Sequence, residues 1–204
     1  MQNSLDNLLA PSLRKSIEEN LGKATLNKIE QRLMERHGMG VVQAIKDFYK
    51  LDSVLREFFG SGADGLESKF IHNIINLEQS KKSPDDWIVL QDPDLTKIFL
   101  ESFADDDKKT ILEAAMDESL VISDILDICK IPQTSGYRKI NYLIDNGLLI
   151  SDGYAVSRDG KKIQKYQTVF NTVKMDIERK TIVMKVQLKK SSLNESTILQ
   201  IIQH

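Results

Sequence analysis

The segment from Ile131 to Gly147 constrains the fold of this chain more than any other. Its second residue, Pro132, has no amide hydrogen and disfavours a helix in the residue before it, but proline is tolerated in the first turn of a new helix. Apolar residues then recur at helical spacing as far as Asn146 and Gly147, where glycine suits the left-handed residue that ends many helices. The segment therefore predicts a helix over 132–146. Its core-facing side is expected to hold Tyr137, Ile140, Leu143 and Ile144.

Two shorter helices are predicted before it. Residues 108–116 have apolar side chains at 111, 112, 115 and 116, which lie on one helical face. The aspartates at 105–107 precede this face, and a carboxylate there can accept hydrogen bonds from the free amides of a helix start. A second helix is expected from Ser123, which would act as its N-cap, to Cys129.

A basic hairpin is predicted after the helix over 132–146. Residues 148–150 and 154–157 form its first strand, Arg158 to Lys161 is a turn sequence, and residues 162–170 return as the second strand. Three helices followed by a hairpin with a basic tip predict a winged helix-turn-helix, here assigned to residues 92–190.

The sequence of this region resembles a known family. Residues 131–149 read Ile-Pro-x-Thr-Ser-x-Tyr-Arg-Lys-Ile-x-x-Leu-Ile-x-x-Gly-Leu-Leu, which is similar to the helix-turn-helix of ArsR-like winged-helix transcriptional regulators. The runs 92–95 and 103–112 resemble the lead-in and first helix of that family, and the turn at 158–161 is similar to archaeal members. The resemblance covers about residues 92–172 and implies a DNA-binding domain.

The distribution of charge agrees with a DNA-binding region. The whole chain has a net charge of −2. Residues 1–129 carry 15 basic and 24 acidic side chains, a net charge of −9, whereas residues 130–190 carry 13 basic and 5 acidic ones, a net charge of +8. A basic face favours DNA because it releases counterions from the phosphates. The same charge could be a solvated face, but its coincidence with the helix-turn-helix favours DNA contact.

We therefore expect a DNA-binding transcriptional regulator that reads the major groove of double-stranded DNA with helix 132–146 and holds the backbone with the wing at 158–162. Arg138 is the best candidate for a base contact, because arginine bonds guanine O6 and N7 in a fork. Gln133 would read a base or bond a phosphate, and Tyr137 fits core packing equally well. The expected DNA-binding residues are Gln133, Thr134, Ser135, Tyr137, Arg138, Lys139, Arg158, Lys161 and Lys162.

The sequence gives no indication of catalysis. It contains no Ser-His-Asp arrangement, P-loop or HExxH motif, so neither an enzyme nor a cofactor is expected. The single cysteine, Cys129, excludes an intramolecular disulfide, fits a reducing cytoplasm and is interpreted as a buried thiol, with no metal site. No apolar stretch approaches the roughly 20 residues of a membrane span, and no secretory signal is recognised. A winged-helix module for protein–protein interaction in a larger assembly is the alternative function.

Residues 1–79 are expected to form a helical bundle that serves dimerisation or sensing. The predicted helices are Pro11–Leu21, Ala24–His37, Val41–Phe59 and Gly65–Glu78, after a segment at Leu5–Leu9 that is either a short apolar turn or the start of a helix. Gly60 to Gly65 matches G-x-G-x-x-G, but a helix and not a strand precedes it, so a connecting loop is favoured over a dinucleotide site. A polar run, Gln79 to Asp86, starts a linker or arm assigned to 80–91, in which 87–90 could be a short strand.

After the wing, residues 172–178 and 181–188 alternate apolar and polar side chains and predict a β-hairpin that extends the wing sheet. Residues 191–204 are expected to contain a short amphipathic helix, which packs on its own domain or pairs with a second subunit. The predicted fold class is thus mainly α with a small antiparallel β part. A homodimer is the expected assembly, with a small-molecule or protein effector possible at the N-terminal bundle.

Overall fold

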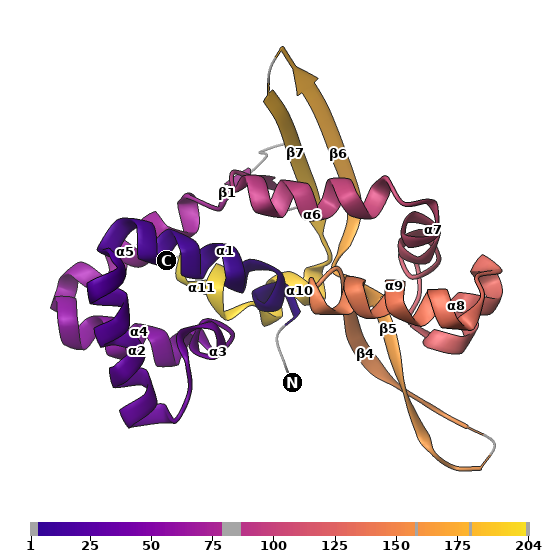
Figure 1. The fold of residues 1–204 in the computed structure, drawn as a ribbon, viewed down its shortest axis with the longest axis horizontal. Coiled ribbons are helices and arrows are strands. Elements are labelled where there is room, and N and C mark those ends of the chain that lie inside the picture. Colours follow the sequence, from indigo (N-terminus) through magenta and orange to yellow (C-terminus); the bar gives the residue numbers. More distant parts are fainter. Residues whose placement is uncertain (1–3, 79–86, 158, 180, 203–204) are drawn as a thin grey trace.

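A computed structural model describes residues 4–78, 87–157, 159–179 and 181–202. It confirms the predicted fold class: a mainly helical α+β chain with an N-terminal helical bundle and a C-terminal winged helix-turn-helix (Figure 1). The N-terminal half contains α1 (Ser4–Leu21), α2 (Lys23–His37), α3 (Val41–Ile45), α4 (Phe48–Phe59), the 3-10 turn η1 (Gly60–Gly62) and α5 (Ala63–His72). Within the described residues, no helix combines the length and the apolar character needed to cross a membrane.

Residues 5–9, interpreted as a short apolar turn or the start of a helix, belong to α1, which runs unbroken through Pro11. Two N-terminal elements differ from the sequence prediction. The single helix predicted over Val41–Phe59 is wrong, since the chain breaks into α3 and α4 at Asp47. The break allows Ile45 and Phe48 both to be fully buried, and the Phe48 amide donates to the hydroxyl of Thr197 at 3.2 Å.

The helix predicted over Gly65–Glu78 is also wrong in its second half. Helix α5 ends at His72, and residues 75–78 form strand β1 (Ile75–Glu78). Ile74 and Leu77 fit a helical period, but β1 instead pairs antiparallel with β2 (Trp87–Leu90). Strand β2 lies inside the predicted linker, whereas Gln79 to Asp86 lie outside the described residues.

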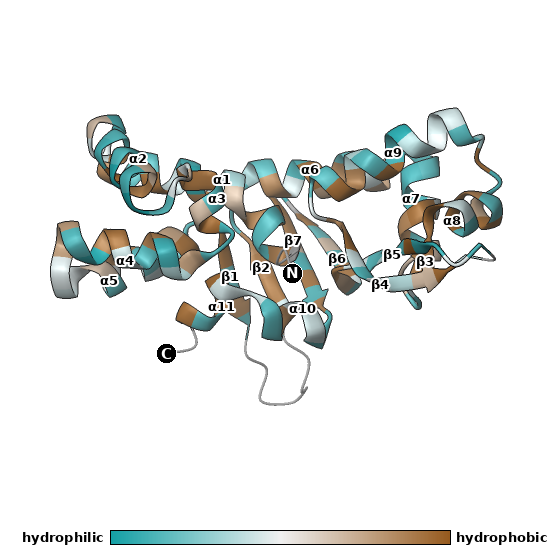
Figure 2. Cartoon of the chain, turned by 90° about the horizontal axis from the view of Figure 1, so that it is seen from below, coloured by the Kyte–Doolittle hydropathy of each residue, from teal (hydrophilic) through white to brown (hydrophobic). Residues whose placement is uncertain are grey.

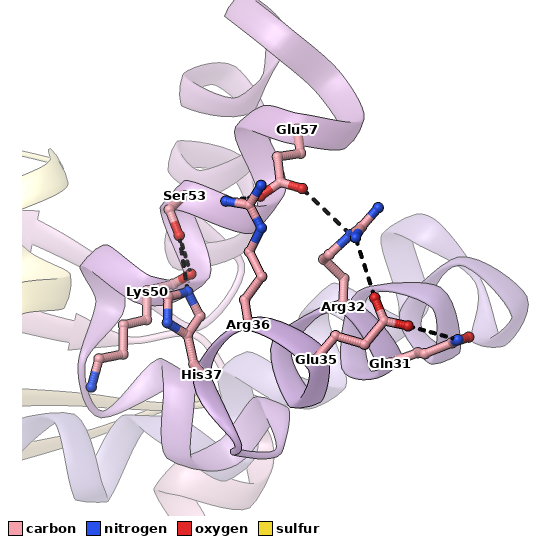
Figure 3. A network of polar contacts seen from close by, with 8 residues as sticks. All are labelled: Gln31, Arg32, Glu35, Arg36, His37, Lys50, Ser53 and Glu57. Atoms are coloured by element: carbon pink, nitrogen blue, oxygen red, sulfur yellow. Dashed lines mark hydrogen bonds and ion pairs between the residues drawn. The ribbon is translucent and has the colours of Figure 1, made fainter.

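A polar network joins the outer faces of α2 and α4 (Figure 3). Glu57 accepts from Arg36 at 2.7 Å and lies 3.4 Å from Nε of Arg32. Beneath these exposed ion pairs, Leu26, Ile29 and Leu33 of α2 are buried. The predicted stop of this helix at Gly38 is confirmed, with φ of 66°.

A four-stranded antiparallel sheet lies between the N-terminal helices and the winged helix (Figures 1 and 2). Its order is β1-β2-β7-β6, with β6 at Phe170–Glu178 and β7 at Thr181–Leu188. The hairpin predicted over 172–188 is therefore confirmed, but the prediction that it extends the wing sheet is wrong. The alternation of apolar residues predicts a hairpin but does not specify which sheet the hairpin joins. Here the apolar face of the hairpin, with Met184 and Val186, continues the apolar face of β2 across the sheet.

The winged helix follows α6 (Pro93–Phe103), whose N-cap Asp92 accepts from the Leu95 amide at 2.9 Å. Its elements are α7 (Asp106–Ala114), β3 (Leu120–Val121), α8 (Ile122–Cys129), α9 (Gln133–Asp145), β4 (Leu149–Val156) and β5 (Lys162–Thr168). The sheet order β3-β5-β4 is that of a winged helix. Asp105 caps α7 as expected, but Ser123 does not cap α8, because that helix already begins at Ile122.

The C-terminal segment packs on the N-terminal helices of the same chain. It forms two helices, α10 (Lys190–Glu195) and α11 (Thr197–Ile202), instead of the one predicted. Asp6 of α1 accepts hydrogen bonds from the Ser196 hydroxyl at 2.5 Å and the Thr197 amide at 3.0 Å. The tail completes one continuous hydrophobic cluster that reaches from α1 through both sheets.

Candidate nucleic-acid interface

Helix α9 is held against the rest of the winged helix by a close contact with α8. A Cβ on Gly136 would overlap the end of the Leu126 side chain, so the two helices approach closely at this glycine. Ile140 and Leu143 are fully buried on the same side. At the far end, Gly147 has φ of 69° and ends the helix as its sequence predicts. These contacts fix which face of α9 is exposed.

The exposed face carries four of the predicted DNA-binding residues: Gln133, Thr134, Tyr137 and Arg138. The Tyr137 side chain is 44% exposed, so the alternative that it packs in the core is wrong. Gly136 occupies the inward position beside Leu126, and this turns Tyr137 outward. Arg138 is exposed and makes no ion pair among the described residues. Ser135 is half-buried, and its hydroxyl donates to the Pro132 carbonyl at 3.1 Å.

Lys139 lies differently from its neighbours. Only 18% of its side chain is exposed, and Nζ lies 2.7 Å from Oδ1 of Asp105 and 2.8 Å from Oδ2 of Asp107. The hydrogen bonds that Lys139 donates to Asp105 and Asp107 raise the pKa of Lys139. Burial raises the pKa of Asp105, but hydrogen bonds from Lys139 and the Lys108 amide outweigh it, and the net pKa is lowered. Lys139 therefore joins α9 to the start of α7 and is already paired.

A hollow of about 290 Å³ lies beside this ion pair. It is lined by Asp105, Lys108, Arg138, Lys139 and Tyr142. Lys108 Nζ stands 4.1 Å from the centre of the Tyr142 ring, whose hydroxyl donates to Glu101 at 3.2 Å. Burial and the bond to Glu101 raise the pKa of Tyr142. Lys108 Nζ also donates to the Glu101 carbonyl at 3.2 Å, so Arg138 is the cation of this lining that makes no ion pair and no hydrogen bond among the described residues.

Two exposed residues of this surface were missed by sequence reasoning. Asn141 lies three residues after Arg138, on the exposed side of α9, and an asparagine there has the groups to bond adenine N6 and N7. The helical spacing of Thr134, Arg138 and Asn141 was the available signal. Lys130 is exposed in the turn before α9 and has φ of 55°.

The wing is a two-stranded projection with a tight tip. The Ser157 amide donates to the Lys161 carbonyl at 2.9 Å, and Gly160 has φ of 79°. The Lys161 side chain is 81% exposed and lies 2.9 Å from Asp159. Hydrogen bonds from Ser157 and then Lys161 lower the pKa of Asp159. Lys162 is exposed at the start of β5, and Arg158 lies outside the described residues.

The wing also exposes apolar side chains. Tyr154, Val156 and Ile163 are 61%, 72% and 42% exposed. A β-bulge between Ser151 and Tyr154, where Gly153 has φ of 72°, interrupts the pairing of the first strand just before Tyr154 and Val156. Such side chains suit contact with deoxyribose or with another protein.

The described residues contain one group of carboxylates with the spacing of metal ligands, far from α9. Oxygens of Asp52, Asp64 and Glu67 lie within 4.8 Å of one another around α4, η1 and α5. Arg56 already pairs with Asp52 at 2.7 Å and with Asp64. Glu67 is 1% exposed, and its burial, followed by the charge of and a hydrogen bond with Asp52, raises its pKa to about 8. An arginine and a bound proton thus offset the negative charge of this group.

Cys129 does not belong to that group. Its thiol is half-buried and donates to the Thr110 carbonyl at 3.5 Å. Burial and the nearby Asp107 and Glu113 raise its pKa, which disfavours the thiolate needed for metal binding. The G-x-G-x-x-G match forms η1 and the start of α5, with α4 and not a strand before it.

Comparisons with protein-family models, with curated proteins and with solved structures found no match.

Proposed function

We propose that this protein is a DNA-binding transcriptional regulator of the winged-helix class, with the ArsR-like regulators as its suggested relatives. Helix α9 enters the major groove of double-stranded DNA, and the wing contacts the flanking backbone. The observation that carries the proposal is the exposed face of α9, where Arg138 has no ion-pair partner among the described residues and stands beside Gln133, Thr134 and Tyr137. A cytoplasmic location belongs to the same proposal.

The residues divide between reading bases and holding the backbone. Arg138 bonds a guanine edge, with Gln133 beside it, while Thr134 and Tyr137 bond phosphates that fix the register. Lys161 and Lys162 approach the backbone on the wing side. Lys139 is assigned a supporting part, because its charge is already neutralised by Asp105 and Asp107.

The test is selection of bound fragments from random and genomic DNA at two salt concentrations, followed by titration of the selected sequence. We expect binding that weakens steeply as salt rises. Arg138→Ala should cost about 1–3 kcal/mol on the selected sequence and relax the preference at one position. Lys28→Ala is the matched control, since it removes one exposed positive charge from α2 and should bind like wild type. Equal binding by Arg138→Ala would remove the assignment of Arg138.

A protein-interaction module is the second candidate function, and the exposed Tyr154, Val156 and Ile163 of the wing favour it. The two functions respond differently to salt, because an apolar protein interface does not weaken as a phosphate interface does. Failure of the wild-type protein to bind any DNA at low salt would favour the protein-interaction module over the regulator.

A further inference from the structure

Strand β6 is the open edge of the four-stranded sheet. The sheet order β1-β2-β7-β6 gives β6 one partner, β7, among the described strands. In this two-residue hairpin, Glu178 and Thr181 flank the loop and form a hydrogen-bonded pair. Non-hydrogen-bonded and hydrogen-bonded pairs then alternate along the ladder, so Ile177, Met175 and Val173 belong to non-hydrogen-bonded pairs. The backbone N–H and C=O groups of Val173, Met175 and Ile177 therefore point away from β7. These groups are available to another strand.

Several side chains at this edge are apolar and exposed. Met175 and Ile177 are 41% and 76% exposed, and Ile182 opposite Ile177 is 40% exposed. They continue the apolar face that buries Met184 and Val186 nearer the body of the molecule. The hairpin projects beyond α6, so that helix does not cover the outer end of this face (Figure 1).

The sequence of β6 is complementary to itself in the antiparallel direction. If a second copy pairs around a two-fold axis at Met175, each residue meets the one that lies equally far on the other side of Met175. Lys174, whose Nζ lies 4.4 Å from the centre of the Trp87 ring in its own chain, then opposes Asp176 of the partner subunit, and Val173 opposes Ile177 of the partner subunit. Met175 forms a hydrogen-bonded pair with its own copy, so Lys174 and Asp176 fall in the non-hydrogen-bonded pairs, where side chains approach most closely.

Other registers lose this complementarity. An axis at Lys174 or at Asp176 would place two identical charges directly opposite each other, which is unfavourable. An axis at Val173 or Ile177 would separate Lys174 from Asp176 of the partner subunit. A register in which Met175 opposes Lys174 or Asp176 of the partner subunit would set outward-facing backbone groups against groups that already bond β7. The register at Met175 is therefore the one that satisfies the backbone, the charges and the apolar face together.

We propose that β6 pairs with β6 of a second copy of this chain, so that two four-stranded sheets join into one in a two-fold symmetric homodimer. Symmetric dimers are formed by self-complementary surfaces of this kind. The surface is distinct from α9 and the wing, so the dimer can be tested independently of DNA binding. A two-fold axis would relate two winged helices, as reading of two half-sites requires.

The test is the oligomeric state of the full chain without DNA, measured by sedimentation velocity over a range of concentrations. We expect wild type to be a dimer. Lys174→Asp and Asp176→Lys should each raise the dimer dissociation constant at least about tenfold, because each variant places like charges opposite one another twice. The double variant Lys174→Asp/Asp176→Lys should recover the dimer. Lys28→Asp, on exposed α2, controls for charge reversal as such.

A mixture of the two single variants gives the sharpest result. In the proposed register each Asp at 174 then faces a Lys at 176, so the mixture should form a heterodimer although neither variant dimerises well alone. Circular dichroism melting of each variant checks that it is folded. A wild-type monomer at all concentrations would overturn the proposal. So would single variants that dimerise like wild type, or variants that neither the double change nor mixing restores.

Discussion

Lys139 Nζ lies 2.7 Å from Asp105 Oδ1, and this contact joins the outer helix of the winged helix, α9, to the N-cap of α7. Asp105 thus has two tasks, because the same carboxylate oxygen also accepts the Lys108 amide at 3.0 Å. A second oxygen, from Asp107, lies 2.8 Å from Lys139. The charge of Lys139 is therefore already paired within the chain. Arg138 next to it has no ion-pair partner among the described residues and can contact a ligand.

Lys139→Met should reduce stability more than it reduces DNA affinity. Methionine keeps the aliphatic stem but leaves Asp105 and Asp107 without their counter-charge, so we expect a loss of about 1 kcal/mol and a melting temperature lower by about 2–4 °C. Lys109→Met is the control, because Lys109 is exposed and its pair with Glu113 is 3.9 Å long. Below the melting transition, a DNA-affinity loss in Lys139→Met as large as that in Arg138→Ala would contradict this assignment.

Lys161→Ala should weaken DNA binding without altering which sequence is preferred. The Lys161 side chain is 81% exposed at the wing tip, and in the proposed binding mode it contacts a phosphate and no base edge. The slope of log affinity against log salt should fall in magnitude by about 1, and relative affinities for mutated sites should stay constant. Titrations at four salt concentrations measure the slope. A changed base preference would assign Lys161 to base reading instead.

Gly147→Ala should destabilise the whole chain. Gly147 has φ of 69°, and an added Cβ would lie 2.7 Å from the backbone nitrogen of Leu8 in α1. Strain and overlap together should cost about 2–3 kcal/mol in free energy of unfolding. Gly153→Ala separates the two effects, since Gly153 has φ of 72° but nothing within 4 Å of its Cβ position. Denaturant unfolding of both variants measures the difference, and equal losses would show that the approach of α1 contributes nothing.

The sequence predicted those features that depend on neighbouring residues. Pro132 and Gly147 bracket α9, and the aspartates at 105–107 were identified as candidates for the cap of α7 because a cap requires only local residue types. The alternation in 172–188 identified a hairpin for the same reason. The basic character of residues 130–190 was visible from composition alone.

Features that depend on distant residues were not predictable. Ile74 and Leu77 fit a helical period, and only pairing of 75–78 with 87–90 makes that segment a strand. The partner of Lys139 lies 34 residues earlier in the chain, so its spacing in α9 could not separate it from Arg138. Alternation in β6 and β7 does not specify which sheet they join. Tyr137 faces outward because Gly136 takes the inward position, a contact that depends on Leu126 of another helix.

The stability of the N-terminal helices should fall as pH rises from about 5 to 9. Burial and then Asp52 raise the pKa of Glu67 from 4.5 to about 8, so the folded state holds a proton that the unfolded state has lost in this range. The favourable contribution of protonated Glu67 to the free energy of unfolding is complete below its pKa in the unfolded chain. It is lost as pH rises through its pKa in the folded chain. Arg56 partly offsets the charge of Asp52, and we expect a loss of roughly 1–3 kcal/mol over this interval.

Glu67→Gln should remove much of this pH dependence, because glutamine occupies nearly the same volume and cannot ionise. The variant should be more stable than wild type at pH 9 and similar to it at pH 5, as measured by urea unfolding. Glu35→Gln is the control, since the Glu35 side chain is 49% exposed on α2 and should leave the profile unchanged. If wild type and Glu67→Gln lose the same stability between pH 5 and 9, the ionisation of Glu67 does not destabilise the folded state. The pKa of Glu67 would then not be raised by folding, and Asp52 and Asp64 would be the only carboxylates whose charge Arg56 has to balance.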